Sequence, residues 1–219
     1  VVFALAMAVQ AYTEPGDSVI IQQPVYYPFQ EVIRDNDRKV INNSLVLGND
    51  GKYHMDLEDF ERKVVENQVK LFLLCSPHNP VGRVWTREEL ESLAEICIRH
   101  DVIVVSDEIH GDFIFSGRHQ VFAGISEALG NRTITCTSPS KTFNLAGLQI
   151  SNIFIVNPVL RKKFKDRIAA AGYSQLNLLG LVACQAAYQY GSDWHRELMV
   201  YLKGNIEFLK DYVKEHLPQ

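Results

Sequence analysis

The sequence has none of the glycine-rich loops by which many proteins hold nucleotide phosphates. Neither a GxGxxG nor a GxxxxGK(S/T) pattern occurs among its 13 glycines, which disfavours a dinucleotide or nucleoside triphosphate site. The four cysteines have no CxxC spacing, and the seven histidines lack the short spacings typical of metal ligands. We therefore predict no metal site and no disulfide framework. The cysteines are Cys75, Cys97, Cys136 and Cys184.

Basic runs and long apolar runs are also absent. Lys and Arg total 22 against 26 Asp and Glu, and the net charge of -4 argues against a nucleic-acid surface. No apolar run approaches the ~20 residues of a membrane span. The apolar N-terminus lacks the basic segment of a signal peptide. Three cysteines lie in or beside apolar runs, as reduced buried thiols do. We expect a cytoplasmic protein with neither a nucleic-acid nor a membrane partner.

Apolar runs and amphipathic segments alternate along the 219 residues, of which 47% are hydrophobic. Short apolar runs bounded by turn residues predict strands over 18–22, 39–47, 71–75, 102–105, 133–137 and 151–156. Helical spacing and capping residues predict helices over 2–12, 29–38, 56–66, 86–100, 158–171, 172–190 and 193–216. Strands that alternate with helices predict an α/β fold, with a mostly parallel central sheet between two helical layers.

One lysine follows a predicted strand in a setting that favours covalent chemistry. Lys141 comes shortly after the strand over 133–137, with small hydroxyl residues before it and a glycine-containing apolar segment after it. Such an amine suits an imine with a carbonyl cofactor. The hydroxyls of Ser138 and Ser140 could hold an anionic group beside it. The alternative is that Lys141 is an ordinary solvated loop lysine.

Two other polar side chains follow predicted strands. Asp107 lies just past the apolar run 102–105, where a carboxylate at the base of an apolar sheet needs a cationic partner. Asn79 follows the run 71–75, in a loop that two prolines stiffen. In open α/β sheets, ligands bind beyond the carboxyl ends of the strands. The alternatives are a capping or surface role for Asp107 and a turn-forming role for Asn79.

The motifs SPHNPVG (76–82), SDEIH (106–110) and SKTFN (140–144) occur together in this chain. In combination they resemble the signature of fold-type I pyridoxal-phosphate (PLP) enzymes of the class I/II aminotransferase group. The residues within these motifs are similar to those of the MalY/PatB branch, which contains the cystathionine and cysteine-conjugate β-lyases. The resemblance spans nearly all 219 residues and implies a PLP-dependent transferase-like large domain, a three-layer α/β/α sandwich.

The resemblance implies roles for particular side chains around the PLP ring. Asp107 would hold the pyridine nitrogen, Asn79 the phenolic oxygen, and Lys141 the aldehyde carbon as an imine. His110 occupies a position that faces the cofactor, where many relatives have a tyrosine. Tyr26 would stack on the ring.

Roles toward the phosphate and the substrate follow from the same resemblance. Ser138 and Ser140 would contact the phosphate. Tyr27 would point its hydroxyl toward the substrate, and the freed Lys141 amine would act as the general base. Many relatives carry a phosphate-binding arginine eight residues after the lysine, where this chain has Gln149. Ser138 and Ser140 would then carry more of the phosphate, along with the loop before Val1 and a partner subunit.

The implied activity is a PLP-dependent carbon–sulfur β-lyase that converts cystathionine or related cysteine S-conjugates to a thiol, pyruvate and ammonia. An aminotransferase that uses the same residues is the alternative enzyme. A regulatory protein that binds a transcriptional activator is a third reading, because the MalY branch includes a lyase with that second role. The resemblance also implies a homodimer. Residues 1–219 would form an incomplete PLP-binding large domain, flanked by an N-terminal arm and a C-terminal small domain. The arginine for the substrate carboxylate would lie beyond Gln219.

Overall fold

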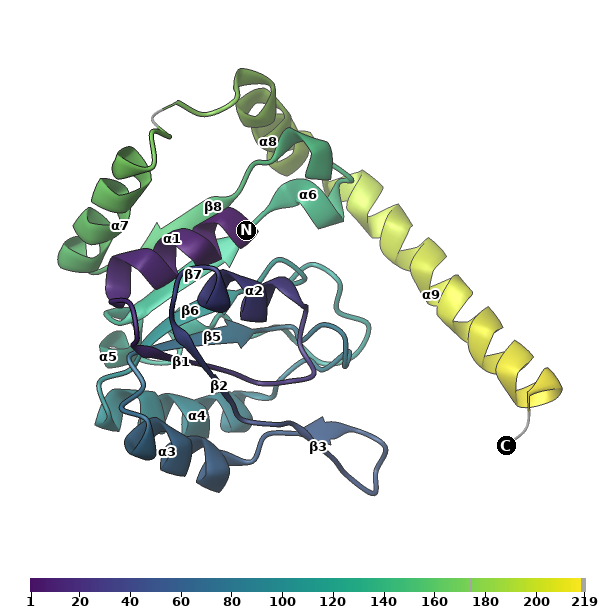
Figure 1. Ribbon diagram of the computed structural model, residues 1–219. Coiled ribbons are helices and arrows are strands. Elements are labelled where there is room, and N and C mark those ends of the chain that lie inside the picture. Colours follow the sequence, from purple (N-terminus) through teal and green to yellow (C-terminus); the bar gives the residue numbers. More distant parts are fainter. Residues whose placement is uncertain (174, 218–219) are drawn as a thin grey trace.

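The computed structural model describes residues 1–173 and 175–217, and a six-stranded sheet forms its centre (Figure 1). The strand order is β2-β1-β5-β6-β7-β8, and all neighbours are parallel except β7 and β8. This arrangement confirms the predicted α/β fold with a mostly parallel sheet. The strands are β1 Ser18–Ile21, β2 Lys39–Asn42, β5 Leu71–Cys75, β6 Ile103–Asp107, β7 Thr133–Thr137 and β8 Asn152–Ile155.

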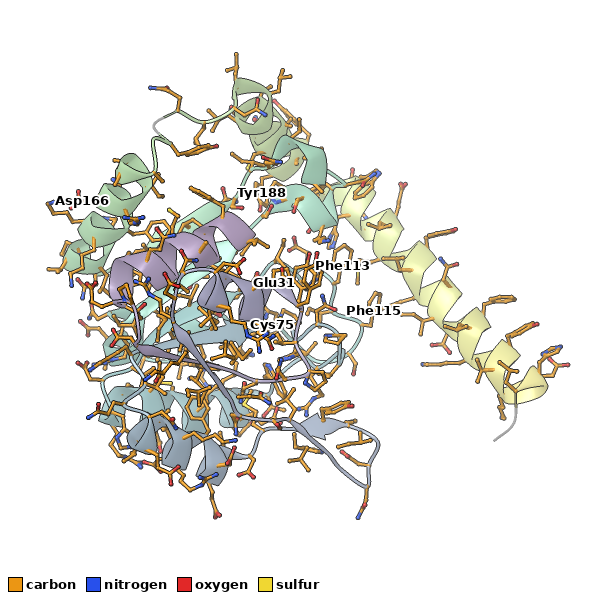
Figure 2. All side chains as sticks on the ribbon, viewed as in Figure 1. Glu31, Cys75, Phe113, Phe115, Asp166 and Tyr188 are labelled. Atoms are coloured by element: carbon orange, nitrogen blue, oxygen red, sulfur yellow. The ribbon has the colours of Figure 1, made fainter. Side chains whose placement is uncertain are left out.

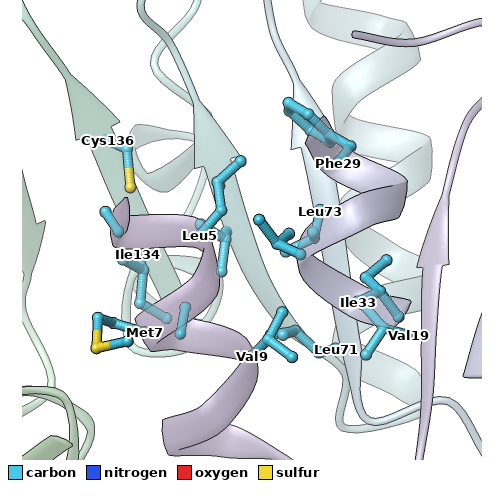
Figure 3. Close-up of a cluster of buried hydrophobic side chains, with 14 of the residues drawn as sticks. Leu5, Met7, Val9, Val19, Phe29, Ile33, Leu71, Leu73, Ile134 and Cys136 are labelled. Carbon is cyan, nitrogen blue, oxygen red and sulfur yellow. The ribbon is translucent and has the colours of Figure 1, made fainter. Parts of the chain in front are cut away.

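Helices cover both faces of the sheet because alternate residues of the central strands point to opposite sides. In β5, Leu71 and Leu73 pack on one face while Phe72 and Leu74 pack on the other. The first face is covered by α1 (Val2–Tyr12), α2 (Pro28–Arg34) and α7 (Pro158–Ala170). Figure 3 shows α1 side chains such as Leu5 against this face. The second face is covered by α3 (Leu57–Glu66), α4 (Arg87–Arg99) and α5 (Glu127–Gly130).

The predicted starts of two helices are confirmed by their caps. The Asp56 carboxylate accepts a 2.9 Å hydrogen bond from the amide of Asp59 at the start of α3. Thr86 and Glu89 form a complete capping box at the start of α4, with bonds of 3.2 and 2.8 Å. Each cap satisfies amide groups that have no partner within the helix.

Several predicted boundaries were wrong. The helix expected over 29–38 ends at Arg34, and Asp37 turns the chain with a φ of 60°. The strand expected over 39–47 divides into β2 and β3 (Val46–Leu47), which pairs with β4 (Tyr53–His54) in a separate hairpin. The helix expected over 172–190 begins only at Leu178. The strand expected over 102–105 extends two residues further, so that Asp107 is the last residue of β6.

The remaining helices lie beyond the sheet's carboxyl edge or project from the body. Two short segments, α6 (Pro139–Thr142) and the 3-10 turn η2 (Ala146–Leu148), connect β7 to β8, and another 3-10 turn, η1 (Phe122–Gly124), precedes α5. Helix α8 (Leu178–Tyr190) leads into α9 (Ser192–His216), which extends away from the domain (Figure 1). Among the described residues, none of these helices combines the length and apolarity needed to cross a membrane.

Candidate active site

The carboxyl ends of β5, β6 and β7 meet at one edge of the sheet, and each of the three sequence motifs begins there. Asp107 ends β6, in register with Cys75 of β5 and Cys136 of β7; Cys75 is labelled in Figure 2. Asn79 follows β5, and Lys141 lies in α6 directly after β7. Parallel pairing of these three strands therefore brings the amide, the carboxylate and the amine to the same edge.

Asp107 is a buried carboxylate with only 5% of its surface exposed. Burial raises its pKa to about 6, while the Ile109 amide and the ammonium groups of Val1 and Lys141 act in the opposite direction. Within the described residues, its hydrogen bond comes from the Ile109 amide, at 3.1 Å. A carboxylate this enclosed, with a single amide donor among the described residues, favours a cationic partner.

Lys141 is placed by the turn of helix in which it stands. The Ser138 hydroxyl caps α6 by accepting a 3.1 Å bond from the Ser140 amide, and donates a 2.6 Å bond to the Ile150 carbonyl. The hydroxyl proton of Ser138 is thus committed within the chain. The Lys141 side chain is exposed. Burial lowers the pKa of half-buried His110, and the charge of Lys141 lowers it further.

The Asn79 loop is joined to the tyrosine motif through the backbone. The Tyr26 amide donates a 3.0 Å bond to the Asn79 carbonyl, and the Asn79 amide donates to Cys75 Sγ at 3.4 Å. The loop closes on itself because the His78 amide bonds the Arg83 carbonyl at 2.8 Å. This network leaves the Asn79 side chain half-buried at the same edge as Asp107.

Two cavities border this edge. The larger, about 730 Å³, is lined by Tyr26, Ser138, Ser140 and Gln149, together with apolar side chains of α1 and α7. Tyr26 is 39% exposed, and its ring centroid lies 5.1 Å from that of Tyr27. Tyr27 is 65% exposed and is not among the residues that line this cavity.

The second cavity, about 540 Å³, shares Ser138 with the first. Its polar lining includes Glu108, His119 and Tyr188, the last labelled in Figure 2. Asn79, Asp107, His110 and Lys141 are absent from the lining of both cavities. The structure thus gathers the predicted residues at one edge but opens its larger cavity on the side of Tyr26, Ser138 and Ser140.

Sequence reasoning missed four residues that support this edge. The buried Glu108 and the partly buried His119 pair at 2.8 Å, and Thr142 donates a 2.6 Å bond to Asp112. The sequence does show two adjacent carboxylates, Asp107 and Glu108, at the end of a buried strand. Both must find hydrogen-bond donors if they are buried, and this requirement was the available signal for Glu108. The sequence held no signal for its partner eleven residues later.

The fold and the strand-end residues define a class of protein: the chain has the fold of the large domain of PLP-dependent transferases. The model of the family "Aminotransferase class I and II" matches residues 3–216, and the chain belongs to this family. Within the family it falls in the branch of PatB and MalY.

Individual relatives show how far the similarity extends. The chain is 46% identical over 220 residues to cystathionine beta-lyase PatB of Bacillus subtilis (strain 168), covering 100% of this chain and 57% of that protein. It is 34% identical to protein MalY of Escherichia coli (strain K12), covering 100% of this chain and 56% of that protein. The crystal structure of cystalysin from Treponema denticola, which contains a pyridoxal 5'-phosphate cofactor, matches with a TM-score of 0.96 and 40% identity over 99% of this chain and 55% of that one. The chain spans a little over half the length of the curated relatives it matches.

Proposed function

We propose that this protein is a pyridoxal 5'-phosphate-dependent carbon–sulfur β-lyase that cleaves cystathionine or related cysteine S-conjugates. The observation that carries the proposal is Asp107, a buried carboxylate at the end of β6, next to the strand end from which Lys141 follows. The similarity to PatB, a cystathionine beta-lyase, supports the choice of substrate class.

The residues at this edge fit the cofactor. When bound, PLP supplies an aldehyde that reacts with amines and a protonated ring that withdraws electrons. Asp107 is buried and has a single hydrogen-bond donor, the Ile109 amide, among the described residues. The N–H of a pyridinium ring would supply a second donor to this carboxylate. Asn79 offers an amide donor for a ring oxygen. Tyr26 offers an aromatic face at the wall of the cavity, to which a flat ring can stack.

The chain's own residues then have distinct tasks. Lys141 would hold the aldehyde carbon of PLP and, once the substrate amine has freed it, its Nζ would accept the proton from the substrate Cα. Asp107 would accept a hydrogen bond from the protonated ring nitrogen, and the ring would then stabilise the electron pair left on Cα. The thiolate would leave from Cβ, and water would hydrolyse the remaining three-carbon enamine to pyruvate and ammonia. Ser140 would bind the phosphate, because the hydroxyl proton of Ser138 is already donated to Ile150. Tyr27 is proposed to meet the substrate from its exposed position beside Tyr26.

The test uses the protein at its full natural length with L-cystathionine. We expect pyruvate release, an absorption band at about 420 nm and a borohydride-stable adduct on Lys141. Lys141→Ala should lose the band and the adduct while keeping its thermal stability, because this side chain is exposed. A protein without the band, or a band that survives Lys141→Ala, would refute the assignment.

A second measurement separates the lyase from an aminotransferase that uses the same residues. The protein is incubated with the amino acid in the presence and absence of a 2-keto acid. Pyruvate release that does not require the keto acid supports the lyase. Amino transfer that depends on it, with no release of a thiol, would assign the protein to the transaminases of its family.

We also propose that the protein is a homodimer. The support is the set of large apolar side chains that α8 leaves exposed, which includes Leu178, Leu179 and Tyr190. Light scattering on the full-length protein tests the assembly. A monomer that retains lyase activity would contradict it.

A further inference from the structure

Two consecutive buried carboxylates stand at the carboxyl end of β6, one as its last residue and one directly after it. Asp107 and Glu108 are 5% and 4% exposed, and among the described residues they are the only Asp or Glu side chains classed as buried. They point to opposite faces of the sheet, because Asp107 shares its face with Cys75 and Cys136 while Glu108 contacts Phe122 of the other core. The proposed function uses only the first of them, so the second needs its own explanation.

Both oxygens of Glu108 have hydrogen-bond partners. Its Oε1 accepts from Ser106 Oγ at 2.9 Å and from the Phe122 amide at 3.1 Å, and its Oε2 pairs with His119 Nε2 at 2.8 Å. Burying a carboxylate is costly unless such donors surround it. The side chain therefore joins the end of β6 to the segment that returns at 119–122.

The backbone of Glu108 adds two more links. Its amide donates to the Cys136 carbonyl of β7 at 2.8 Å, and its carbonyl accepts from the Gly111 amide at 2.9 Å. The loop 109–118 is thus closed at both ends by one residue. This loop contains the half-buried His110, and it begins directly after Asp107.

We propose that Glu108, through its pair with His119, is a positioning residue that fixes the Asp107 carboxylate and the His110 ring against the cofactor ring. The proposal rests on the proposed PLP site. Glu108 lies on the far face of the sheet and does not line the larger cavity. It acts by holding the backbone on both sides of Asp107, so that the acid meets the ring nitrogen in one orientation.

The variants separate positioning from plain stability. Glu108→Ala leaves His119 Nε2 and the Phe122 amide without their acceptor, whereas Glu108→Gln keeps an oxygen for Ser106 and Phe122. Ser106→Ala and His119→Ala each remove one donor and serve as milder changes if Glu108→Ala does not fold. Thr133→Val is the matched control, because it removes a buried 2.8 Å bond to the Leu129 carbonyl at the opposite end of β7.

The measurements are the PLP dissociation constant, the 15N shift of the pyridine nitrogen in labelled PLP, and thermal unfolding without cofactor. We expect Glu108→Ala to weaken PLP binding by about tenfold or more and to shift the 15N signal toward the unprotonated ring. His119→Ala should show the same changes to a smaller extent. Glu108→Gln keeps the bonds to Ser106 and Phe122 but loses the Oε2 acceptor for His119, so its values should fall between those of Glu108→Ala and the wild type. Thr133→Val should lower only the unfolding temperature.

Two results would overturn the inference in different ways. If wild-type protein binds PLP and the folded Glu108 and His119 variants keep its affinity and 15N shift, the positioning role is wrong and the proposed function stands. If Thr133→Val moves the 15N shift as much as Glu108→Ala does, the effect is general destabilisation and the positioning role is again wrong. If the wild-type protein binds no PLP at all, the proposed function fails together with this inference.

Discussion

Thr142 donates a 2.6 Å hydrogen bond from its Oγ1 to Oδ2 of Asp112, and so ties the residue after Lys141 to the loop that follows Asp107. The Asp112 carbonyl also accepts from His195 Nε2 of α9 at 3.0 Å. Helix α6, the loop and α9 therefore meet at one residue. Lys141 is exposed and has no ion pair among the described residues, so its position is set by this backbone frame rather than by its own contacts.

The first prediction removes this link. Thr142→Val keeps the shape of the buried side chain and deletes its hydroxyl. We expect the lost bond to lower the free energy of unfolding by about 1 kcal/mol. The loss stays this small because Asp112 is exposed, so water can replace the hydroxyl at its carboxylate. We also expect kcat for pyruvate release to fall by roughly tenfold, since small displacements of a reacting amine are costly. Thr142→Ser should restore both values. A Thr142→Val protein with unchanged kcat would show that the bond does not place Lys141.

The second prediction concerns Gln149, which lines the larger cavity with Ser138 and Ser140. Gln149 adopts a left-handed conformation with a φ of 50°, so Arg can replace it without a new backbone cost. Gln149→Arg should tighten PLP binding by roughly ten- to hundredfold, the worth of a charge-assisted hydrogen bond to phosphate. Gln149→Glu should weaken it. Equilibrium titration measures both, and equal affinities for the two variants would place the phosphate elsewhere.

Local patterns in the sequence predicted the parts of the fold that depend on near neighbours. The capping box joins Thr86 and Glu89, which are three positions apart, and the run Leu71–Cys75 is recognisable as a strand because it is wholly apolar. The edge of the sheet that carries the candidate site was predictable in the same way, because polar residues directly after apolar runs lie where parallel strands end. The general position of Asn79, Asp107 and Lys141 was therefore predictable.

The features that the sequence did not predict depend on hydrogen bonds between residues far apart in the chain. The strand expected over 39–47 breaks at Asn43, whose side-chain amide turns inward to bond the Asp56 carbonyl and the Asp59 carboxylate, both at 2.9 Å. Ser138 resembled a phosphate ligand, but its hydroxyl proton goes to the Ile150 carbonyl twelve residues later. Partners at such separations leave no periodic signal in the sequence, so neither contact could be found before the fold was known.

The third prediction is a pH dependence of stability that depends on two opposing groups. Burial lowers the pKa of His78 from its ordinary value of 6.5 to about 4. Between pH 6.5 and pH 4, His78 is therefore protonated in the unfolded state but neutral in the folded state. Its contribution to stability is fully present above pH 6.5 and is lost as the pH falls to 4. Burial raises the pKa of Asp107 from 3.8 to about 6, so Asp107 adds stability as the pH falls through the same range.

These opposite slopes should nearly cancel in the protein without cofactor, because each is worth up to about 3 kcal/mol. Asp107→Asn should then lose stability between pH 6.5 and 4, and His78→Gln should gain it. Urea unfolding at pH 7 and pH 4.5 measures the difference. The double variant serves as the control and should return to the flat wild-type profile. An Asp107→Asn profile parallel to that of the wild type would contradict the burial-driven shift of Asp107.

The last prediction separates the two serines that flank Pro139. Ser138 caps α6 with its hydroxyl, so Ser138→Ala should cost about 1 kcal/mol of stability, the usual effect of losing an N-cap.

The Ser140 hydroxyl is half-buried at the cavity and, within residues 1–173 and 175–217, forms no hydrogen bond. Ser140→Ala should therefore leave the unfolding temperature unchanged and weaken the binding of PLP by about tenfold. Pyridoxal, which lacks the phosphate, should bind Ser140→Ala as it binds the wild type. If Ser140→Ala weakens both ligands equally, its hydroxyl does not contact the phosphate, and the anion must be held by other groups around the cavity.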